Sequence, residues 1–350
     1  MGTPEFAVES LKRLVEGGYN VVAVVTQPDK PVGRHQDTLQ PSQVKLYAVE
    51  HGLPVLQPVK MKDPEFVEQL RSYQADLQAV VAFRMLPEVV WAMPKFGTFN
   101  VHAALLPQYR GAAPINWAVI NGEKETGVTT FFLDHDIDTG RIIMQKRFPI
   151  PESADVEYVY DGLMHLGADL ALETIDALIA AGGNIESMPQ EKLIGEGVEL
   201  KSAPKIFKET CRIDFHKPAK QVYDFVRGLS PYPGSWTEIK KKAPVVIFED
   251  ADGEMPEATA HPAQQKSAAK IQVLKIFKTS LTEFSRGVAP VGSLRVFEKK
   301  LQVACLDQWL NIEELQLSGK KRMDAAAFLN GMKDIAYYEC QKAQETEEEW

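Results

Sequence analysis

The stretches NVVAVVT (residues 20–26) and LQAVVAF (residues 77–83) decide the fold of the first half of the chain. Each is an almost continuous apolar run rich in β-branched residues, which is typical of a strand buried on both faces of a parallel sheet. Segments with helical spacing of apolar residues accompany them at residues 66–73, 114–120 and 156–181. Strands that alternate with helices predict a Rossmann-like, doubly wound α/β sheet.

Three further strands complete the predicted sheet. Residues 98–102 alternate in polarity and end in a Pro-containing loop. Residues 126–133 and 142–150 flank a polar turn, which indicates an antiparallel pair. The long helix at residues 156–181 is stopped by Gly182-Gly183, because glycine ends helices readily.

The second half of the chain has a different rhythm. After a short helical segment and a Pro/Gly turn come short alternating runs, at residues 245–248, 271–277, 292–297, 301–305 and 312–317. Many short strands with polar turns predict a small β-barrel of the oligonucleotide-binding (OB) type. With 350 residues, about two domains are expected. We assign them as a catalytic domain (1–183), a linker (184–211), an OB-like domain (212–335) and a tail (336–350).

The composition is that of an ordinary soluble globular protein, with 45% hydrophobic and 25% charged residues. No apolar run approaches the ~18 residues of a membrane-spanning helix, and the N-terminus lacks the pattern of a secretory signal. Cys211, Cys305 and Cys340 lie far apart, and neither Cys-x-x-Cys nor His-Glu-x-x-His occurs. We therefore expect a cytoplasmic protein without a disulfide framework, a structural zinc site or a membrane partner.

Charge is distributed unevenly along the chain. Residues 1–200 carry 16 Lys and Arg against 27 Asp and Glu, a net of −11, whereas residues 201–342 carry 23 against 17, a net of +6. Four glutamates then follow in the terminal tail, which we expect to be disordered. The asymmetry suggests a polyanionic partner for the second domain. Taken alone, a mild excess of lysine more often only keeps a domain soluble.

The segment NVHAALLPQYRGAAP (residues 100–114) is the most informative for chemistry. Asn100 and His102 are two apart on a predicted strand, so both side chains point to one face. They lie where that strand ends, the edge at which such sheets bind ligands. An amide and an imidazole suit acyl transfer, because both can donate to the oxygen of a tetrahedral intermediate and His can carry a proton. An isolated Asn-x-His is more often a strand-end histidine that hydrogen-bonds a loop.

A second polar cluster, DHDIDTG (residues 134–140), occupies the turn of the predicted antiparallel pair. A carboxylate here can orient His102 and stabilise its protonated form. Acids in a turn can equally be ordinary solvated turn chemistry. A calcium site is the weakest interpretation, because the run lacks a calcium-ligand pattern. The residues alone leave these alternatives open.

Motifs spread along the chain resemble those of the methionyl-tRNA formyltransferase family. They read GTPEFA (2–7), TQPDKP (26–31), GR (33–34), PSxVK (41–45), ALLP (104–107), RGAAPI (110–115), IDTG (137–140), RID (212–214), PYP (231–233), SW (235–236) and LxGKKRM (317–323). The resemblance covers nearly the whole chain, both domains in the expected order. It implies transfer of a formyl group from 10-formyltetrahydrofolate, as co-substrate, to the amino group of initiator methionyl-tRNA, without a metal.

The resemblance also implies roles for individual residues. The catalytic Asn, His and Asp of the family fall on Asn100, His102 and Asp138, where Asn and protonated His hold the oxyanion and Asp keeps His positioned and charged. The folate-contacting segment falls on Ala104, Leu105, Leu106 and Pro107. The loop that reaches the tRNA acceptor end falls on residues 30–45. The residues expected to contact tRNA are Arg34, Lys45, Lys320, Lys321 and Arg322. We expect the enzyme to act as a monomer.

The chain departs from the family in three places. Relatives carry a short apolar strand before Gly2, and its absence is expected to expose core surface and unpaired backbone groups, which points to a misassigned start. Ala104 replaces a serine of the folate segment, so about 0.5–1.5 kcal/mol of folate binding is expected to be lost. The loop after Arg34 reads HQDT, poorer in cations than in many relatives.

Other functions fit the sequence less well. A folate-dependent formyltransferase acting on a nucleotide-linked amino sugar would share Asn100, His102 and Asp138, but the Arg34 loop and the basic segment 319–323 favour tRNA. A formyl-folate hydrolase would not need a basic barrel. An RNA-binding relative without catalysis would not need the three polar residues intact. A dinucleotide-dependent oxidoreductase is disfavoured, because no Gly-x-Gly-x-x-Gly follows the first strand.

Overall fold

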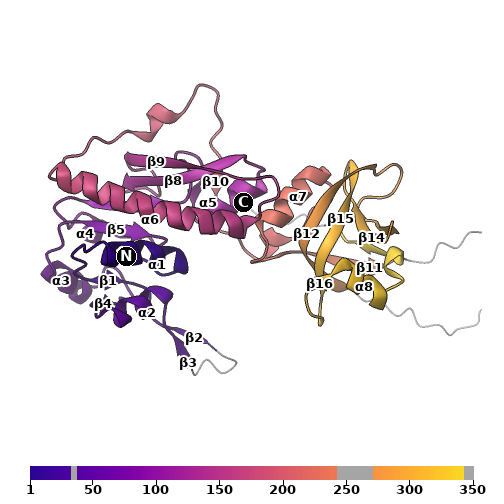
Figure 1. Cartoon of the computed structure of the whole chain (residues 1–350), viewed down its shortest axis with the longest axis horizontal. Helices are drawn as coiled ribbons and strands as arrows, with labels where there is room; N and C mark the ends of the chain where they lie inside the picture. Colours follow the sequence, from indigo (N-terminus) through magenta and orange to yellow (C-terminus); the bar gives the residue numbers. More distant parts are fainter. Residues whose placement is uncertain (33–37, 243–270, 343–350) are drawn as a thin grey trace, which may run out of the picture. The chain divides into compact units, whose positions relative to one another are not determined.

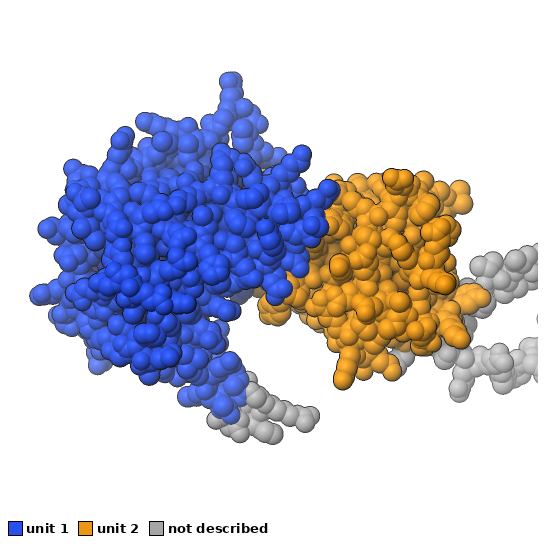
Figure 2. All heavy atoms as spheres, viewed as in Figure 1, with its two compact units in different colours: residues 1–206 blue, residues 207–350 orange. Residues whose placement is uncertain are grey.

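The structure, a computed structural model, describes residues 1–32, 38–242 and 271–342 (Figure 1). The chain divides into two compact units, Met1–Ile206 and Phe207–Trp350, which are coloured separately in Figure 2. The division falls inside the predicted linker, residues 184–211. That segment contains two 3-10 helices and a strand: η1 (Gln190–Leu193), β10 (Ser202–Ala203) and η2 (Glu209–Cys211).

The main sheet of the first unit contains the strand on which Asn100 and His102 lie. Strands β5 (Gln78–Val81) and β6 (Thr98–His102) are parallel, and β8 (Glu125–Phe132) and β9 (Ile142–Pro149) continue from β6 in antiparallel order. Each of these strands lies where the sequence predicts it, with bounds that differ by no more than a few residues. The antiparallel pair predicted around the polar turn is thus confirmed.

A second parallel pair, β1 (Val24–Val25) and β4 (Val55–Leu56), is joined to β5 through the N-terminus. The Gly2 N–H donates to the Val25 carbonyl at 3.0 Å, and the Val81 N–H donates to the Met1 carbonyl at 2.9 Å. Met1 and Gly2 thus lie between β1 and β5. Strand β1 is much shorter than the predicted strand at residues 20–26.

Helices cover both faces of this sheet. Val24 and Val81 belong to one hydrophobic cluster, with α1 (Glu5–Glu16), α2 (Gln43–Glu50), α5 (Pro114–Ile120) and α6 (Val156–Ala180). Val25 and Val80 belong to another, with α3 (Pro64–Ser72) and α4 (Glu88–Trp91). Neighbouring residues of each strand therefore point to opposite cores, which confirms the predicted doubly wound α/β layer.

The longest helix, α6, has clear start and stop signals. The Asp155 carboxylate accepts from the Tyr158 N–H at 3.0 Å, which satisfies one of the free N–H groups of the first turn. After Ala180, Gly182 and Gly183 adopt φ values of +58° and +85°, a left-handed backbone that favours glycine. The chain thereby leaves the helix and turns back towards the sheet (Figure 1).

The second unit is a small antiparallel barrel, whose strands follow helix α7 (Ala219–Gly228) in the chain. Its strand order is β13-β14-β15-β12-β11-β17, with β16 (Met323–Asp324) beside β15. The strands are β11 (Ser235–Lys241), β12 (Gln272–Ser285), β13 (Leu294–Phe297), β14 (Lys300–Ala304), β15 (Gln308–Leu317) and β17 (Tyr338–Cys340). A bridge between Ser293 and Glu339 brings the two edges together, so the sheet is nearly closed. The predicted OB-like barrel is confirmed.

Several details of the second unit lay beyond the sequence analysis. Strand β11 and helix α8 (Ala325–Gly331) had not been predicted. Strand β12 continues to Ser285, past the predicted end at residue 277, and β15 begins at Gln308, before the predicted start at residue 312. The predicted strand at residues 245–248 and the acidic end of the tail fall outside the described residues. Within the described parts of the chain, no helix is long and apolar enough to cross a membrane. The three cysteines are all buried and unpaired.

Candidate active site

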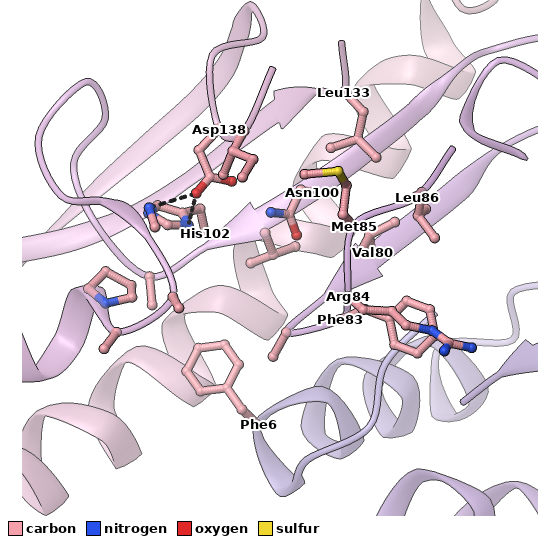
Figure 3. A pocket seen from close by; sticks show the side chains of 18 of the residues that line it. Phe6, Val80, Phe83, Arg84, Met85, Leu86, Asn100, His102, Leu133 and Asp138 are labelled. Carbon is pink, nitrogen blue, oxygen red and sulfur yellow. Dashed lines mark hydrogen bonds and ion pairs between the residues drawn. The ribbon is translucent and has the colours of Figure 1, made fainter. Parts of the chain in front are cut away.

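Strand β6 brings Asn100 and His102 to one pocket. Both side chains line a cavity of about 770 Å³ in the first unit, at the carboxyl end of β6, as their spacing predicts (Figure 3). The loop after β5 and the loop after β8 form its other walls. In Figure 3, His102 and Asp138 lie on one side of Asn100, and Met85 and Leu86 lie on the other.

Asn100 carries an unused hydrogen-bonding group. Its Oδ1 is buried and has no partner among the residues that the structure describes. A buried polar atom without a partner costs free energy on the order of 1–3 kcal/mol. Native structures therefore seldom leave such an atom unpaired unless a ligand or water supplies the missing bond. The Asn100 amide is thus available to a bound molecule.

His102 is held by a loop and faces an acid. Its side chain is only 6% exposed, and its Nε2 lies 2.9 Å from the Tyr109 carbonyl oxygen. A carbonyl only accepts, so Nε2 carries the hydrogen and Nδ1 is the nitrogen that gains or loses a proton. Nδ1 lies 3.7 Å from Asp138 Oδ2, an ion-pair distance but too long for a hydrogen bond. The loop hydrogen bond expected of a strand-end histidine and an acid partner from the polar turn are therefore both present.

Asp138 is fixed by backbone groups. Its Oδ2 accepts from the Gly111 N–H at 2.9 Å, and its backbone has a φ of +57°. The left-handed region is uncommon for residues other than glycine, though Asp tolerates it better than most. The other acids of the turn differ: Asp134 accepts from the Thr139 hydroxyl at 2.7 Å, which is ordinary turn chemistry. Within this cluster, Asp138 therefore faces His102, whereas Asp134 makes ordinary turn contacts.

The predicted folate segment does not line this pocket. Ala104, Leu106 and Pro107 are buried, Leu105 is partly buried, and none of the four is among the lining residues. Their backbone is bound internally: the Thr129 hydroxyl donates to the Ala104 carbonyl at 2.6 Å and accepts from the Leu106 N–H at 3.1 Å. Ala104 itself is fully buried in the core cluster of α6. In the described structure, Ala104 therefore packs in the core, and its segment is hydrogen-bonded to Thr129 of β8.

The pocket wall contains residues that the sequence analysis did not single out. They follow β5 and β8 and are largely apolar: Ala82, Phe83, Met85, Leu86, Trp91, Leu133 and Ile137. The signal that points to the first group is its position directly after a predicted parallel strand that neighbours the strand of Asn100. Met85 and Ile137 are 67% and 58% exposed, so both offer apolar surface to a molecule in the cavity.

The residues expected to contact tRNA occupy different environments. Lys45 Nζ lies 2.6 Å from Asp29 Oδ2, and this hydrogen bond, followed by one from Gln57, lowers the pKa of Asp29. Arg322 pairs with Glu314 through two hydrogen bonds of 2.6 and 2.7 Å, which lower the pKa of Glu314.

The other expected tRNA contacts are Lys320, Lys321 and Arg34. The two lysines are exposed. Arg34 lies outside the described residues.

Comparisons with known proteins agree with this geometry. The family model described as "Formyl transferase" matches residues 1–175, and the one described as "Formyl transferase, C-terminal domain" matches residues 205–333. The methionyl-tRNA formyltransferase of Parabacteroides distasonis is 56% identical over 97% of this chain and 96% of its own length. That of Phocaeicola vulgatus is 58% identical over 95% and 94%. The chain belongs to the methionyl-tRNA formyltransferase family.

Solved structures extend the likeness to more distant members of the formyltransferase fold. The sugar 3N-formyl transferase WlaRD matches with a TM-score of 0.57 and 19% identity, over 91% of this chain and 97% of its own. An N-formyltransferase from Helicobacter canadensis matches with a TM-score of 0.55 and 22% identity, over 89% and 96%. At these identities the likeness is one of fold. Among the described residues, no group of three or more His, Cys, Asp or Glu side chains is placed to hold a metal ion.

Proposed function

We propose that the pocket around Asn100, His102 and Asp138 transfers the formyl group of 10-formyltetrahydrofolate to the α-amino group of initiator methionyl-tRNA. The observation that carries this proposal is that Asn100, His102 and Asp138 line one cavity, with the Asn100 Oδ1 unpartnered among the described residues, in a chain of this family. All lining residues come from the first unit of one chain, which fits action as a monomer. The substrates place the reaction in the cytoplasm.

Asn100 acts on the carbonyl oxygen of the formyl group. As the α-amine nitrogen forms its bond to the formyl carbon, the carbonyl electron pair moves to oxygen. The Asn100 amide, with no competing partner for Oδ1 among the described residues, is free to turn its N–H towards that oxygen. An oxyanion donor of this kind typically contributes about 10²–10³ in rate.

His102 and Asp138 handle protons. The bond between the formyl carbon and the folate nitrogen breaks with its electron pair on nitrogen, which then needs a proton, while the new ammonium must lose one. Nδ1 is the titrating nitrogen of His102, because the Tyr109 carbonyl binds the Nε2 hydrogen. Asp138 Oδ2 lies 3.7 Å from Nδ1, which leaves room for Nδ1 to reach a substrate atom. His102 gives its Nδ1 proton to the leaving folate nitrogen and takes the proton that the new ammonium loses, so the side chain ends in the state in which it began.

The apolar part of the pocket fits the folate co-substrate. Folate offers a flat heteroaromatic ring, and the apolar lining of the pocket includes Met85, Leu86, Trp91 and Ile137. Mostly apolar walls with few polar groups are usual for such ligands. The co-substrate supplies the activated formyl group. The chain supplies the surface that binds it and keeps water from the reacting carbon.

A direct assay tests the proposal. Formyl transfer from 10-formyltetrahydrofolate to initiator methionyl-tRNA is measured for the wild type and for Asn100→Ala, His102→Asn and Asp138→Asn. We expect each variant to lose about 10²–10⁴ in kcat/KM, because each removes a positioned donor or proton carrier. His216→Asn, an exposed histidine of the second unit, is the matched control and is expected to keep wild-type rates.

The outcome that removes a residue from the scheme is a near-normal rate in its variant. A folded wild type that formylates a nucleotide-linked amino sugar and leaves methionyl-tRNA unchanged would overturn the choice of acceptor.

A further inference from the structure

Gln190 is a fully buried amide outside the residues discussed so far. It opens η1, in the segment that returns from the end of α6, and its exposed fraction is 0%. Glutamine is seldom fully buried, because each of its polar atoms must find a partner. The partners of this amide belong to the two loops that hold His102 and Asp138.

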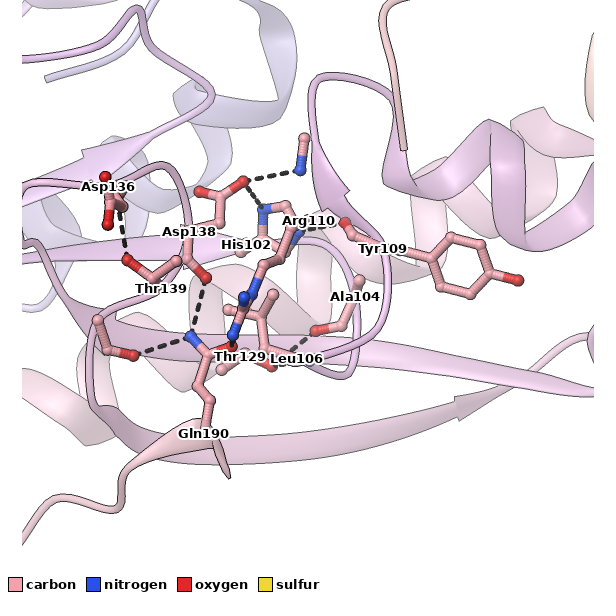
Figure 4. Close-up of polar contacts among 12 residues, drawn as sticks. His102, Ala104, Leu106, Tyr109, Arg110, Thr129, Asp136, Asp138, Thr139 and Gln190 are labelled. Atoms are coloured by element: carbon pink, nitrogen blue, oxygen red, sulfur yellow. Dashed lines mark hydrogen bonds and ion pairs between the residues drawn. The ribbon is translucent and has the colours of Figure 1, made fainter. Parts of the chain in front are cut away.

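Each polar atom of the Gln190 amide has two partners (Figure 4). Its Nε2 donates to the carbonyl oxygens of Asp138 and Gly140, both at 2.8 Å. Its Oε1 accepts from Arg110, at 3.0 Å from Nε and 2.7 Å from Nη2. Carbonyls only accept and a guanidinium only donates, so the contacts fix the orientation of the amide.

The first loop contains Asp138 with its φ of +57°. A residue other than glycine keeps a left-handed backbone only where surrounding contacts over-determine it, at a cost of about 1–3 kcal/mol. Gln190 supplies such contacts from both sides, because it binds the carbonyl of Asp138 itself and that of Gly140. These two bonds set the direction in which the Asp138 carboxylate leaves the backbone.

The second loop contains Arg110, whose neighbours make the other contacts of the site. The carbonyl of Tyr109 binds His102 Nε2, and the N–H of Gly111 binds Asp138 Oδ2. Holding the Arg110 side chain therefore restrains the peptide units on both of its sides. A single amide thus connects the backbone that orients His102 with the backbone that orients Asp138.

The segment that presents Gln190 is itself fixed. Met188 exchanges two backbone hydrogen bonds of 2.8 Å with Ile142, directly after the Asp138 loop. Farther on, β10 pairs in parallel with β7 (Arg110–Gly111), and the Tyr109 N–H donates to the Lys201 carbonyl at 2.7 Å. Contacts on both sides of Gln190 hold its backbone in place.

We propose that Gln190 is a positioning residue for formyl transfer: it sets the distance and direction between Asp138 and His102 by binding both of their loops. The inference rests on the proposed function of that site. Gln190 is absent from the residues that line the cavity, so it is expected to act through Asp138 and without contact to substrate.

The central variant is Gln190→Met, which keeps the volume and removes all four hydrogen bonds. We expect kcat to fall about 10–100-fold, because a small misplacement of catalytic groups has effects of this size. KM for either substrate is expected to change less than threefold, because the pocket lining is untouched. Gln190→Glu keeps the acceptor for Arg110 and lacks both donors to the Asp138 loop. It is expected to be as slow as Gln190→Met.

A double-mutant cycle separates positioning from a general structural role. If Gln190 acts through Asp138, adding Gln190→Met to Asp138→Asn lowers kcat less than threefold further. Multiplied losses in the double variant would overturn the proposal, and so would a Gln190→Glu enzyme with the wild-type kcat. Thermal unfolding is recorded for every variant.

The remaining outcomes also decide the matter. Gln190→Met and Gln190→Glu proteins that are unfolded at the assay temperature would make Gln190 a stability residue and contradict the proposal. A wild type that transfers no formyl group would contradict the proposed function itself. An active wild type whose Gln190 variants have the same kcat would contradict only the role of Gln190. The expected result is an active wild type with slow, folded variants and unchanged KM.

Discussion

At the residue scale, the site depends on a glycine as much as on its polar side chains. Gly111 has a φ of +129°, and a Cβ placed there would lie 2.4 Å from the Ala203 carbonyl oxygen. Close approach of β10 to β7 therefore requires the missing side chain. The same peptide unit supplies the N–H that Asp138 accepts. Backbone packing and acid placement are thus set at one position.

We predict that Gly111→Ala lowers both stability and activity. The clash with Ala203 backbone and the unfavourable φ together are expected to lower the free energy of unfolding by on the order of 2–4 kcal/mol. The kcat for formyl transfer should fall more than tenfold as Asp138 loses its donor. Urea unfolding and steady-state kinetics measure the two effects.

The matched control is Gly52→Ala. Gly52 also has a positive φ, +68°, but a Cβ there meets nothing within 4 Å. It is expected to lose only the ~1 kcal/mol of left-handed strain and no activity. Equal losses in both variants would mean that backbone strain alone, without the contact to Ala203, explains the Gly111 effect.

How far single residues were predictable depends on the range of the interactions that define them. Asn100 and His102 were brought to one face by the strand period, a local property, and Asp138 by family resemblance. The contacts of Gln190 could not be predicted from the sequence, because they join it to carbonyls some 50 residues earlier in the chain. For Ala104 the structure places the side chain in the core, a consequence of tertiary packing that local sequence does not encode.

At the element scale, strand β5 of the first unit was predictable as a continuous apolar run because it is largely buried on both faces. The strand at residues 20–26 was predicted too long: only Val24 and Val25 find a partner strand, in β4. Hydrophobicity indicates where a strand can be buried, but its length is set by the neighbours available to pair with it. Short helices such as α2 were missed for a related reason, since tertiary packing stabilises them more than their own sequence does.

At the scale of the whole molecule, the two halves differ in charge. The net charge of −11 over residues 1–200 and +6 over residues 201–342 fits substrate chemistry divided between a folate pocket and a polyanion-binding barrel. Not every cation contributes equally. Lys45 and Arg322 are each paired with a carboxylate, whereas Lys320 and Lys321 are exposed at the turn before β16.

We predict that Lys320→Ala/Lys321→Ala weakens tRNA binding and makes it less sensitive to salt. Each lost phosphate contact should reduce the slope of log affinity against log salt by about 0.7–0.9. Filter binding or fluorescence titration at several salt concentrations gives the slope. Lys60→Ala/Lys62→Ala, an equal charge change on the first unit, should leave it unchanged. Identical slopes in the two double variants would assign tRNA binding to overall charge.

The return of the chain after α6 has a consequence for how the protein is made. Asn100, His102 and Asp138 have all been synthesised well before Gln190 and the β10 segment leave the ribosome. A nascent chain that ends at α6 carries the three side chains proposed to react, yet lacks the residues that bind the loops around them. The match to the first family model ends at residue 175, short of that segment. A gene fragment trimmed to this boundary would encode a chain without those contacts, so we expect any shortened version to need the segment through Ala203 to hold the loops of His102 and Asp138 in place.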